Sequence, residues 1–364
     1  MGNKRSLLLY PFSILYRLVT DIRNILYNTG ILPSEEFDLP VISIGNITVG
    51  GTGKTPLAEY LIDLLRKDFK VALLSRGYKR RSRGFRIASR SSTAGELGDE
   101  PLQIFLKFPE IVVAVDADRV SGIKTIIKLR PETDVIILDD GFQHRRVKPG
   151  LSILLTDYNR LITRDYLMPY GNLRENQKNR KRADVLVVSK APQTVSGSEM
   201  EEITKEVQWN DNQKLFFTSI SYKDLIPLYE NSASERPGLK EMNRENHGAV
   251  LATGIAAPGP LKAMLERYFD EIIHLDFPDH HYFSENDIEK IRTAWKDLIS
   301  QEKVLITTEK DAVRLREFTN IDESLKRSFY YIPVVISFLN DDKHEFDNMI
   351  FEYVRKNKRD NRIP

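Results

Sequence analysis

The stretch VISIGNITVGGTGKTPLAEYL, residues 41–61, joins an apolar run to a glycine-rich turn and then to an amphipathic segment. Backbone N–H groups in such a turn, and at the start of the helix that follows, bind phosphate oxygens. The ammonium of Lys54 can reach the β- and γ-phosphates of a nucleotide, and the hydroxyl of Thr55 can ligate Mg²⁺. The stretch therefore predicts a buried strand, a phosphate-binding loop and a helix.

The loop departs from the usual phosphate-binding pattern at its first glycine, where this chain has Thr48. A structural turn is the alternative interpretation, but the flanking strand and helix favour phosphate binding, and Pro56 suits the first turn of a helix. The residues predicted to bind the nucleotide here are Thr48, Val49, Gly50, Gly51, Thr52, Gly53, Lys54 and Thr55.

An acidic pair, Asp139 and Asp140, follows the apolar run VIIL in the segment TDVIILDDGFQHRR, residues 133–146. Carboxylates at the end of a strand beside a phosphate loop can hold Mg²⁺, so both are predicted metal ligands. Gln143 and His144 follow at the same edge and are predicted to line the nucleotide site, although His144 could equally be a structural histidine.

Apolar runs of strand length recur along the chain with helical patterns between them, as in VALL from Val71 and VLVV from Val185. Continuous apolarity predicts strands covered on both faces by helices. The fold class is α/β, with a P-loop NTPase-type parallel sheet flanked by helices. A second, smaller α/β domain is joined to it by a short strand linker. The predicted domains are residues 1–215, residues 216–338, and a C-terminal helix and tail over 339–364.

The N-terminal segment has an amphipathic pattern, with Leu15, Val19 and Ile22 on one apolar stripe and a cationic flank at Lys4 and Arg5. Two interpretations are open: a helix packed on its own domain, or a helix resting in a membrane interface. The chain has no apolar run long enough to span a bilayer. It has no cysteine, which excludes disulfides, thiolate metal sites and cysteine nucleophiles. Its net charge of +2 excludes a general polycation.

Several classes of nucleotide-binding protein can be separated by short motifs. Val49 stands where partitioning-type ATPases carry a second lysine, and Ser189-Lys190 lacks the aspartate of the guanine-reading Asn-Lys-x-Asp motif. A kinase is the remaining class. The segment LSRGYKRRSRGFR carries the predicted substrate contacts Arg76, Tyr78 and Arg80; RNA binding is the alternative, but few aromatic residues accompany the cations.

The chain resembles the tetraacyldisaccharide 4′-kinase (lipid A 4′-kinase) family of Gram-negative bacteria. The resemblance rests on SIGNITVGGTGKTP, LSRGY, GDEP, VAVDADR, LDDGFQHRR, MPYGNLRE, FPDHHYFS and TTEKDAVRL, which occur in the family's order between Ser43 and Leu315. The family commonly has Ser or Thr at the position of Thr48, so the resemblance implies that the missing glycine is a family trait.

The resemblance implies a role for each matching residue. Asp99 is expected to act as the base, paired with His280 or His281, and Lys54 to assist transfer. Arg174 is expected near the phosphates and Glu175 near the metal. Arg119, in VAVDADR, is expected to contact the substrate.

The resemblance also implies an activity, in which ATP and Mg²⁺ serve to phosphorylate the 4′-hydroxyl of tetraacyldisaccharide 1-phosphate and form lipid IVA. The expected partners are this lipid and the membrane surface, without nucleic acid or an obligate protein partner. The expected location is the cytoplasmic face of the inner membrane. A soluble small-molecule kinase and an RNA-binding or switch NTPase are the alternatives.

Overall fold

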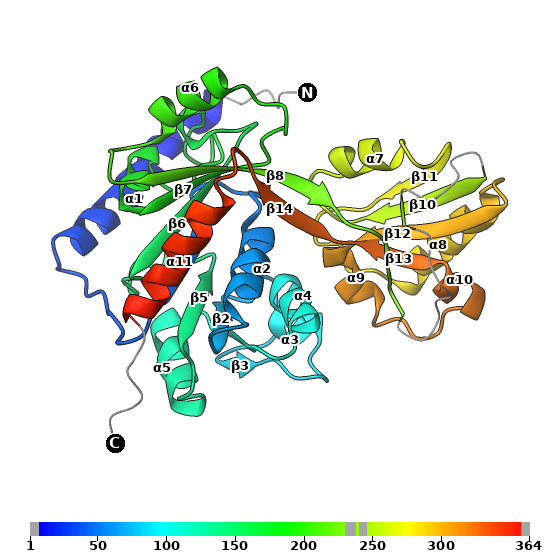
Figure 1. The fold of residues 1–364 in the computed structure, drawn as a ribbon, viewed down its shortest axis with the longest axis horizontal. Coiled ribbons are helices and arrows are strands. Elements are labelled where there is room, and N and C mark those ends of the chain that lie inside the picture. Colours follow the sequence, from blue (N-terminus) through cyan, green and yellow to red (C-terminus); the bar gives the residue numbers. More distant parts are fainter. Residues whose placement is uncertain (1–6, 230–237, 240–245, 358–364) are drawn as a thin grey trace. The chain divides into compact units, whose positions relative to one another are not determined.

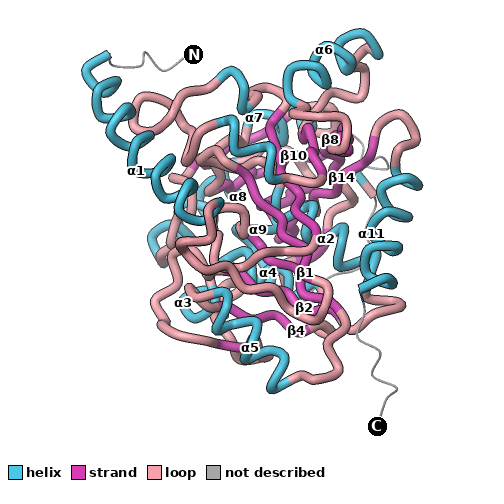
Figure 2. Tube along the Cα trace, turned by 90° about the vertical axis from the view of Figure 1, so that its left-hand side faces the viewer, coloured by secondary structure: helices cyan, strands magenta, loops and turns pink. Residues whose placement is uncertain are grey.

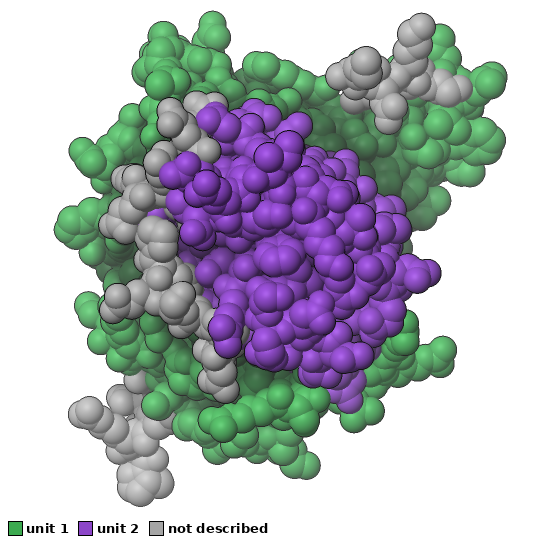
Figure 3. Space-filling view, turned by 90° about the vertical axis from the view of Figure 1, so that its right-hand side faces the viewer, with its two compact units in different colours: residues 1–92, 104–220, 336–364 green, residues 93–103, 221–335 purple. Residues whose placement is uncertain are grey.

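The structure is a computed structural model that describes residues 7–229, 238–239 and 246–357. It forms two compact units, coloured separately in Figure 3. The first comprises Met1–Ser92, Ile104–Ile220 and Ile336–Pro364; the second comprises Thr93–Gln103 and Ser221–Val335. Residues 93–103 thus group with the second unit, although they lie inside the predicted range 1–215. Asp99, in this segment, bonds His280 and Arg314 of the same unit.

The first unit contains a nine-stranded sheet in the order β14-β8-β7-β6-β1-β5-β2-β4-β3 (Figure 1). Its core strands pair in parallel, whereas β3 pairs antiparallel with β4. The bounds are β1 Val41–Asn46, β2 Val71–Ser75, β3 Arg86–Ile87, β4 Val112–Val115, β5 Val135–Asp139, β6 Leu151–Asp157, β7 Val185–Ser189, β8 Lys214–Tyr222 and β14 Val334–Phe338. The predicted α/β class with a large parallel sheet is confirmed.

Helices cover both faces of this sheet because its central strands are apolar on both sides. Helices α5 (Arg119–Leu129) and α6 (Gly197–Val207) pack through apolar side chains on one face. Helix α2 (Lys54–Leu65) contacts β1 and β5 on the other face. Figure 2 shows α2 and α11 (Lys343–Asn357) on one side of the strands. Short 3₁₀ turns occur at Leu7–Leu9, Ile162–Arg164 and Gln177–Arg182.

Helix α1 (Tyr10–Asn28) presents its apolar stripe to solvent. Leu15 and Val19 are 61% and 60% exposed, whereas the polar residues Ser13 and Asn24 are buried. The hydroxyl of Ser13 donates to the Leu167 carbonyl at 3.0 Å. The helix therefore docks on its own unit by polar groups, and its apolar face is left uncovered by the described residues. None of the helices in the described ranges has the length and apolarity needed to cross a membrane. Lys4 and Arg5 lie outside the described residues.

The second unit contains a five-stranded sheet in the order β11-β10-β12-β13-β9. Strands β11, β10, β12 and β13 run parallel, and β9 pairs antiparallel with β13. Helices α8, α9 and α10 supply one apolar cluster against the sheet, and α7 supplies another. The bounds are α3 Ala94–Leu97, α4 Asp99–Lys107, β9 Ile226–Pro227, β10 His247–Thr253, α7 Gly259–Leu265, β11 Glu271–Asp276, α8 Glu285–Asp297, β12 Glu302–Thr308, α9 Glu309–Leu315, α10 Glu323–Arg327 and β13 Phe329–Ile332.

The segment YYIPVVISF, which reads as one strand in the sequence, is divided into β13 and β14 at Pro333. Proline has no N–H to donate to a sheet, so the division at this residue has a direct physical cause. One half pairs in the five-stranded sheet and the other belongs to the nine-stranded sheet.

Candidate active site

The loop between β1 and α2 has the backbone geometry of a phosphate cradle. Gly50 and Gly53 have φ values of 99° and 82°, a region that side chains with a Cβ rarely adopt. Gly53 is the N-cap of α2, which begins at Lys54. A helix N-terminus of this kind attracts anions because its first N–H groups have no partner within the helix.

Side chains from the ends of β6 and β7 bond to the carbonyl groups of this loop. Arg160 donates to the Val49 carbonyl at 2.7 Å, the Ser189 hydroxyl donates to the Thr52 carbonyl at 2.8 Å, and the Lys190 ammonium donates to the Gly51 carbonyl. The C=O and N–H of one planar trans peptide unit point in opposite directions. Fixing the carbonyls therefore fixes the direction of the N–H groups.

Thr48 and Val49 pair with the residues just before Arg174. Thr48 is buried and forms an antiparallel bridge with Leu173, and the Val49 N–H donates to the Asn172 carbonyl at 2.9 Å. Thr48 does not lie in the left-handed region. This explains why the position needs no glycine. It also means that the Val49 N–H is already committed within the protein.

Two cations converge on Asp140. The Lys54 ammonium lies 3.4 Å from its carboxylate, and Arg174 donates to it at 3.0 Å. Burial favours the neutral carboxyl, but Lys54 and Arg174 outweigh it and hold the pKa of Asp140 below its usual value. Asp140 is therefore ionised at neutral pH, and both predicted phosphate-binding cations lie beside the predicted metal ligand.

The neighbouring Asp139 is buried at the end of β5, where the Ser75 hydroxyl donates to it at 3.0 Å. Thr55 lies in the first turn of α2. Carboxylate and hydroxyl oxygens are the donor types that Mg²⁺ prefers, and the set contains no softer ligand. Asp139, Asp140 and Thr55 therefore fit a magnesium ion by chemistry.

Glu175, also a predicted metal ligand, is held in a buried network. Its carboxylate accepts from Arg182 at 2.9 Å, from Gln143 at 3.0 Å and from Asn24 of α1 at 3.2 Å. Gln143 donates in addition to the Asn46 carbonyl at 2.7 Å. Glu175 and Gln143 thus connect α1 to the strand that leads into the phosphate loop.

His144 and Arg119 lie inside the unit near the acidic pair. Burial, reinforced by repulsion from Arg119, lowers the pKa of His144 to about 4, so its imidazole is neutral at physiological pH. Arg119 is buried and donates to the carbonyls of Asp116 at 2.8 Å and Asp139 at 3.4 Å. Burial lowers its pKa to about 10. Arg119 bonds the backbone at the end of β5.

The predicted substrate residues after β2 differ in their surroundings. Arg76 is exposed, and the Tyr78 side chain is 58% exposed. Arg80 donates to the Gly84 carbonyl at 2.7 Å and closes its own loop, and burial lowers its pKa.

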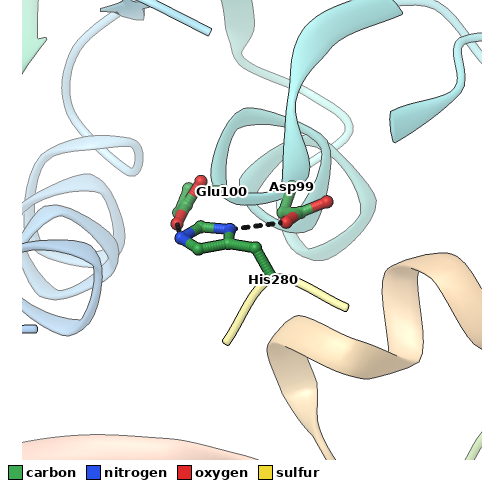
Figure 4. A group of neighbouring side chains, drawn as sticks. All are labelled: Asp99, Glu100 and His280. Carbon is green, nitrogen blue, oxygen red and sulfur yellow. Dashed lines mark hydrogen bonds and ion pairs between the residues drawn. The ribbon is translucent and has the colours of Figure 1, made fainter. Parts of the chain in front are cut away.

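In the second unit, Asp99 opens α4 and is 3% exposed. His280 Nδ1 lies 3.0 Å from Asp99 Oδ2. Figure 4 shows the imidazole between the carboxylates of Asp99 and Glu100, with Nε2 at 4.0 Å from Glu100. His281 instead bonds Asp287 at 2.9 Å. The histidine that partners Asp99 is therefore His280. Asp287 also forms a capping box with Ser284 at the start of α8.

Arg314 of α9 also binds Asp99, with its Nε at 2.6 Å from Oδ1 and its Nη2 at 2.8 Å from Oδ2. A further nitrogen of Arg314 donates to the His280 carbonyl at 2.7 Å. Burial raises the pKa of Asp99, but the bonds from His280 and Arg314 outweigh this, and the pKa lies below its usual value. Asp99 is an ionised acceptor, so His280 Nδ1 is the donor in this bond, and Nε2 is the ring nitrogen that does not face Asp99.

Asp99, Glu100 and His280 each offer a ligand atom within 4.8 Å of the others. Both Asp99 oxygens already accept from Arg314, and a cation there would face the guanidinium. The group is better suited to proton transfer than to metal binding.

Comparison with known proteins identifies the family. A family model described as tetraacyldisaccharide-1-P 4′-kinase, LpxK, matches residues 5–355. The chain belongs to this kinase family. The tetraacyldisaccharide 4′-kinase of Phocaeicola vulgatus is 46% identical over 353 residues, which cover 96% of each chain. The Flavobacterium johnsoniae protein of the same name is 44% identical over 350 residues, 96% of this chain and 97% of that one.

A crystal structure of LpxK from Aquifex aeolicus in complex with ATP is also similar. It has a TM-score of 0.71 and 29% identity, and the match covers 95% of this chain and 98% of that one. The resemblance inferred from the motifs is confirmed.

Four side chains that bond the predicted site residues were not themselves predicted from the sequence to be site residues: Arg160, Arg182, Lys190 and Arg314. Arg314 lies inside the motif TTEKDAVRL, which was singled out without a role for this residue. Lys190 was considered only as part of an incomplete guanine motif.

Proposed function

We propose that this chain transfers the γ-phosphoryl group of ATP to the 4′-hydroxyl of a tetraacylated disaccharide 1-phosphate, forming lipid IVA in lipid A biosynthesis. The observation that carries the proposal is membership of the 4′-kinase family along almost the whole chain. In the reaction the bond from the γ-phosphorus to the bridging oxygen breaks, a bond to the 4′-oxygen forms, and ADP leaves.

The nucleotide binds at the loop that opens α2. The left-handed glycines and the helix N-terminus supply N–H donors, and Lys54 supplies a positive charge. Lys54 and Arg174 already pair with Asp140, so the protein holds both cations close together before phosphate arrives. Such preorganised charge stabilises the transferring phosphoryl group without reorganisation.

Magnesium would be held by Asp139, Asp140 and Thr55, whose oxygens suit it. When bound there, the ion would offset negative charge on the β- and γ-phosphates. Glu175 has its carboxylate in bonds with Arg182, Gln143 and Asn24, and we assign it to holding Arg174 and α1 in place.

The acceptor hydroxyl loses its proton to the Asp99–His280 pair. In this proposal His280 Nε2 accepts the proton, whereas Asp99 orients the imidazole and stabilises its charged form; the bond between Asp99 and His280 Nδ1 supports these roles. Arg314 keeps Asp99 ionised and therefore makes Asp99 itself a weak base. A positioned base of this kind contributes about 10²–10⁴-fold to a rate.

Helix α1 rests in the membrane interface on the cytoplasmic face of the inner membrane, where the lipid substrate lies. Its exposed apolar stripe and its polar docking residues support this placement. The same feature weighs against the soluble small-molecule kinase, and few aromatic residues accompany the Arg76–Arg86 cations for RNA stacking.

The test measures transfer of label from γ-labelled ATP to tetraacyldisaccharide 1-phosphate in detergent micelles. Wild type and Asp211→Asn, an exposed aspartate in the first unit, are expected to form labelled lipid at equal rates. Asp99→Asn is expected to lose transfer while it retains ATP affinity. No lipid labelling by wild type would refute the proposed function.

A further inference from the structure

The second ring nitrogen of His280 faces two carboxylates at the same distance. His280 Nε2 lies 4.0 Å from Glu100 Oε1 and 4.0 Å from Asp279 Oδ2. Both separations are longer than a hydrogen bond. Figure 4 shows the ring with Asp99 on the side of Nδ1 and Glu100 on the side of Nε2. A movement of either of the two nearby carboxylates by about 1 Å would bring it into bonding distance of Nε2.

The ring of His280 is held so firmly that it cannot turn Nε2 away from these carboxylates. The residue has a φ of 61°, in the left-handed region, and its N–H donates to the Gly254 carbonyl at 3.1 Å. Its carbonyl accepts from Arg314 at 2.7 Å, and Nδ1 bonds Asp99 at 3.0 Å. What surrounds Nε2 is therefore decided by the position of the carboxylates and not by rotation of the ring.

Lys310, in the first turn of α9, lies beside both carboxylates. Its ammonium is 3.0 Å from Asp279 Oδ1 and 4.0 Å from Glu100 Oε1. Because Glu100 Oε1 is equally far from His280 Nε2, the two nitrogens are separated by at most twice this distance. The Lys310 side chain is 20% exposed, so solvent screens its charge only in part.

The charged groups around the ring come from α4, from α9 and from the loop before α8. They are Asp99, Glu100, Asp279, Lys310 and Arg314. His281 is turned to Asp287, and Asp311, whose pKa is raised by burial, accepts from the Gly254 N–H. Three carboxylates favour the protonated ring, and the two cations oppose them. A ring that already holds a proton on Nε2 cannot accept one from a sugar hydroxyl.

We propose that Lys310 is a positioning residue for phosphoryl transfer: it keeps Asp279 and Glu100 out of bonding distance of His280 Nε2 and lowers the pH at which this nitrogen takes up a proton. The inference deepens the proposed function and rests on His280 as the proton acceptor. Arg314 cannot replace Lys310 in this role, because its donors are used by Asp99 and by the carbonyls of His280 and His281.

Proton uptake by the ring can be followed directly by ¹H–¹⁵N NMR across pH, with ¹⁵N in the histidine rings and no ATP or lipid present. The chain has six histidines, and His280→Gln assigns the signal of His280. Lys310→Met keeps the apolar stem and removes the charge. We expect it to raise the midpoint of the His280 titration by about 0.5–1 pH unit, the effect of one charge at this range near a protein surface.

The opposite charge change supplies a second variant, whose result does not depend on how well Lys310→Met folds. Asp279→Asn, at a side chain 41% exposed, should lower the midpoint, and the double variant should return toward wild type. Lys296→Met, at an exposed lysine of α8, is the matched control and should leave the midpoint unchanged. An unchanged midpoint in either Lys310→Met or Asp279→Asn would overturn the proposal.

The pH profile of kcat/KM with the lipid substrate separates positioning from a structural role. In Lys310→Met the acidic limb should move to higher pH by the same amount as the ring titration, with activity recovering above it. An equal loss of activity at every pH would overturn the proposal and leave Lys310 a structural role only. Failure of the proposed function is distinct, because wild type would then phosphorylate no lipid although the ring titration still shifts in the variants.

Discussion

Arg314 is predicted to hold the buried carboxylate of Asp99 in the second unit, and Arg314→Met tests this. The Arg314 and Asp99 side chains are 6% and 3% exposed, and both carboxylate oxygens accept from the guanidinium. Methionine keeps much of the apolar stem but removes every donor. Asp99 would remain buried. Of the side-chain bonds to Asp99 described above, the bond from His280 would be left.

Breaking one side of a buried ion pair costs about 3–5 kcal/mol of unfolding free energy, and we expect a loss in this range near neutral pH. The pKa of Asp99 is lower in the folded protein than its unfolded value of about 3.9. Its contribution to stability is therefore present above the unfolded pKa and is lost as pH falls through the folded pKa. The difference between wild type and Arg314→Met should shrink as pH falls, because the buried Asp99 of the variant, without the guanidinium, becomes protonated at a higher pH than Asp99 of the wild type.

Urea unfolding followed by tryptophan fluorescence measures this loss in the correct unit. The chain has two tryptophans, Trp209 in the first unit and Trp295 in the second. A Trp209→Phe background therefore reports on the second unit alone.

Arg267→Met, at an exposed arginine of the same unit, is the matched control and should change little. Adding Asp99→Asn to Arg314→Met should recover part of the loss, because no buried charge is then left unpaired. A loss below about 1 kcal/mol, typical of a surface pair, would refute the reasoning. So would a loss that stays constant with pH.

Two further predictions concern helix α1 and the histidine pair. Leu15→Glu with Val19→Glu should lower binding to anionic vesicles at least about tenfold, since each buried apolar side chain contributes about 1.5–3 kcal/mol. Ile299→Glu, at a residue 92% exposed in the other unit, should not change binding; equal binding by the α1 variant in a sedimentation assay would contradict the membrane assignment. His280→Gln should lower kcat about 10²–10⁴-fold at unchanged ATP affinity, whereas His281→Gln should affect mainly stability. Equal kcat losses in steady-state assays would count against His280 as the proton acceptor.

The local sequence was sufficient to predict the strands and the phosphate-binding loop. Runs such as VIIL are apolar at every position, so they predict strands buried on both faces wherever they lie in the sheet. Gly50, Gly53 and Lys54 are neighbours in the chain, and their joint function needs only the turn that they themselves form. The position of the acidic pair, Asp139 and Asp140, could be predicted in the same way, because the pair ends a strand.

Contacts between segments far apart in the chain could not be predicted from the local sequence. Arg314 lies 215 residues from Asp99, and nothing in its local pattern indicates a buried carboxylate partner. The stripe on α1 predicted an amphipathic helix, but not which face turns inward. That is decided by bonds such as those of Ser13 to Leu167 and Asn24 to Glu175, each more than a hundred residues away.

Coupling between ADP formation and lipid phosphorylation tests the central claim most directly. Purified protein is incubated with ATP, Mg²⁺ and tetraacyldisaccharide 1-phosphate, ADP is quantified, and the product is examined by phosphorus NMR. The account predicts that ADP forms only when the lipid is present, in equal amount to a new phosphomonoester on the 4′-oxygen. ADP formation at the same rate without the lipid, and no new phosphomonoester, would contradict it.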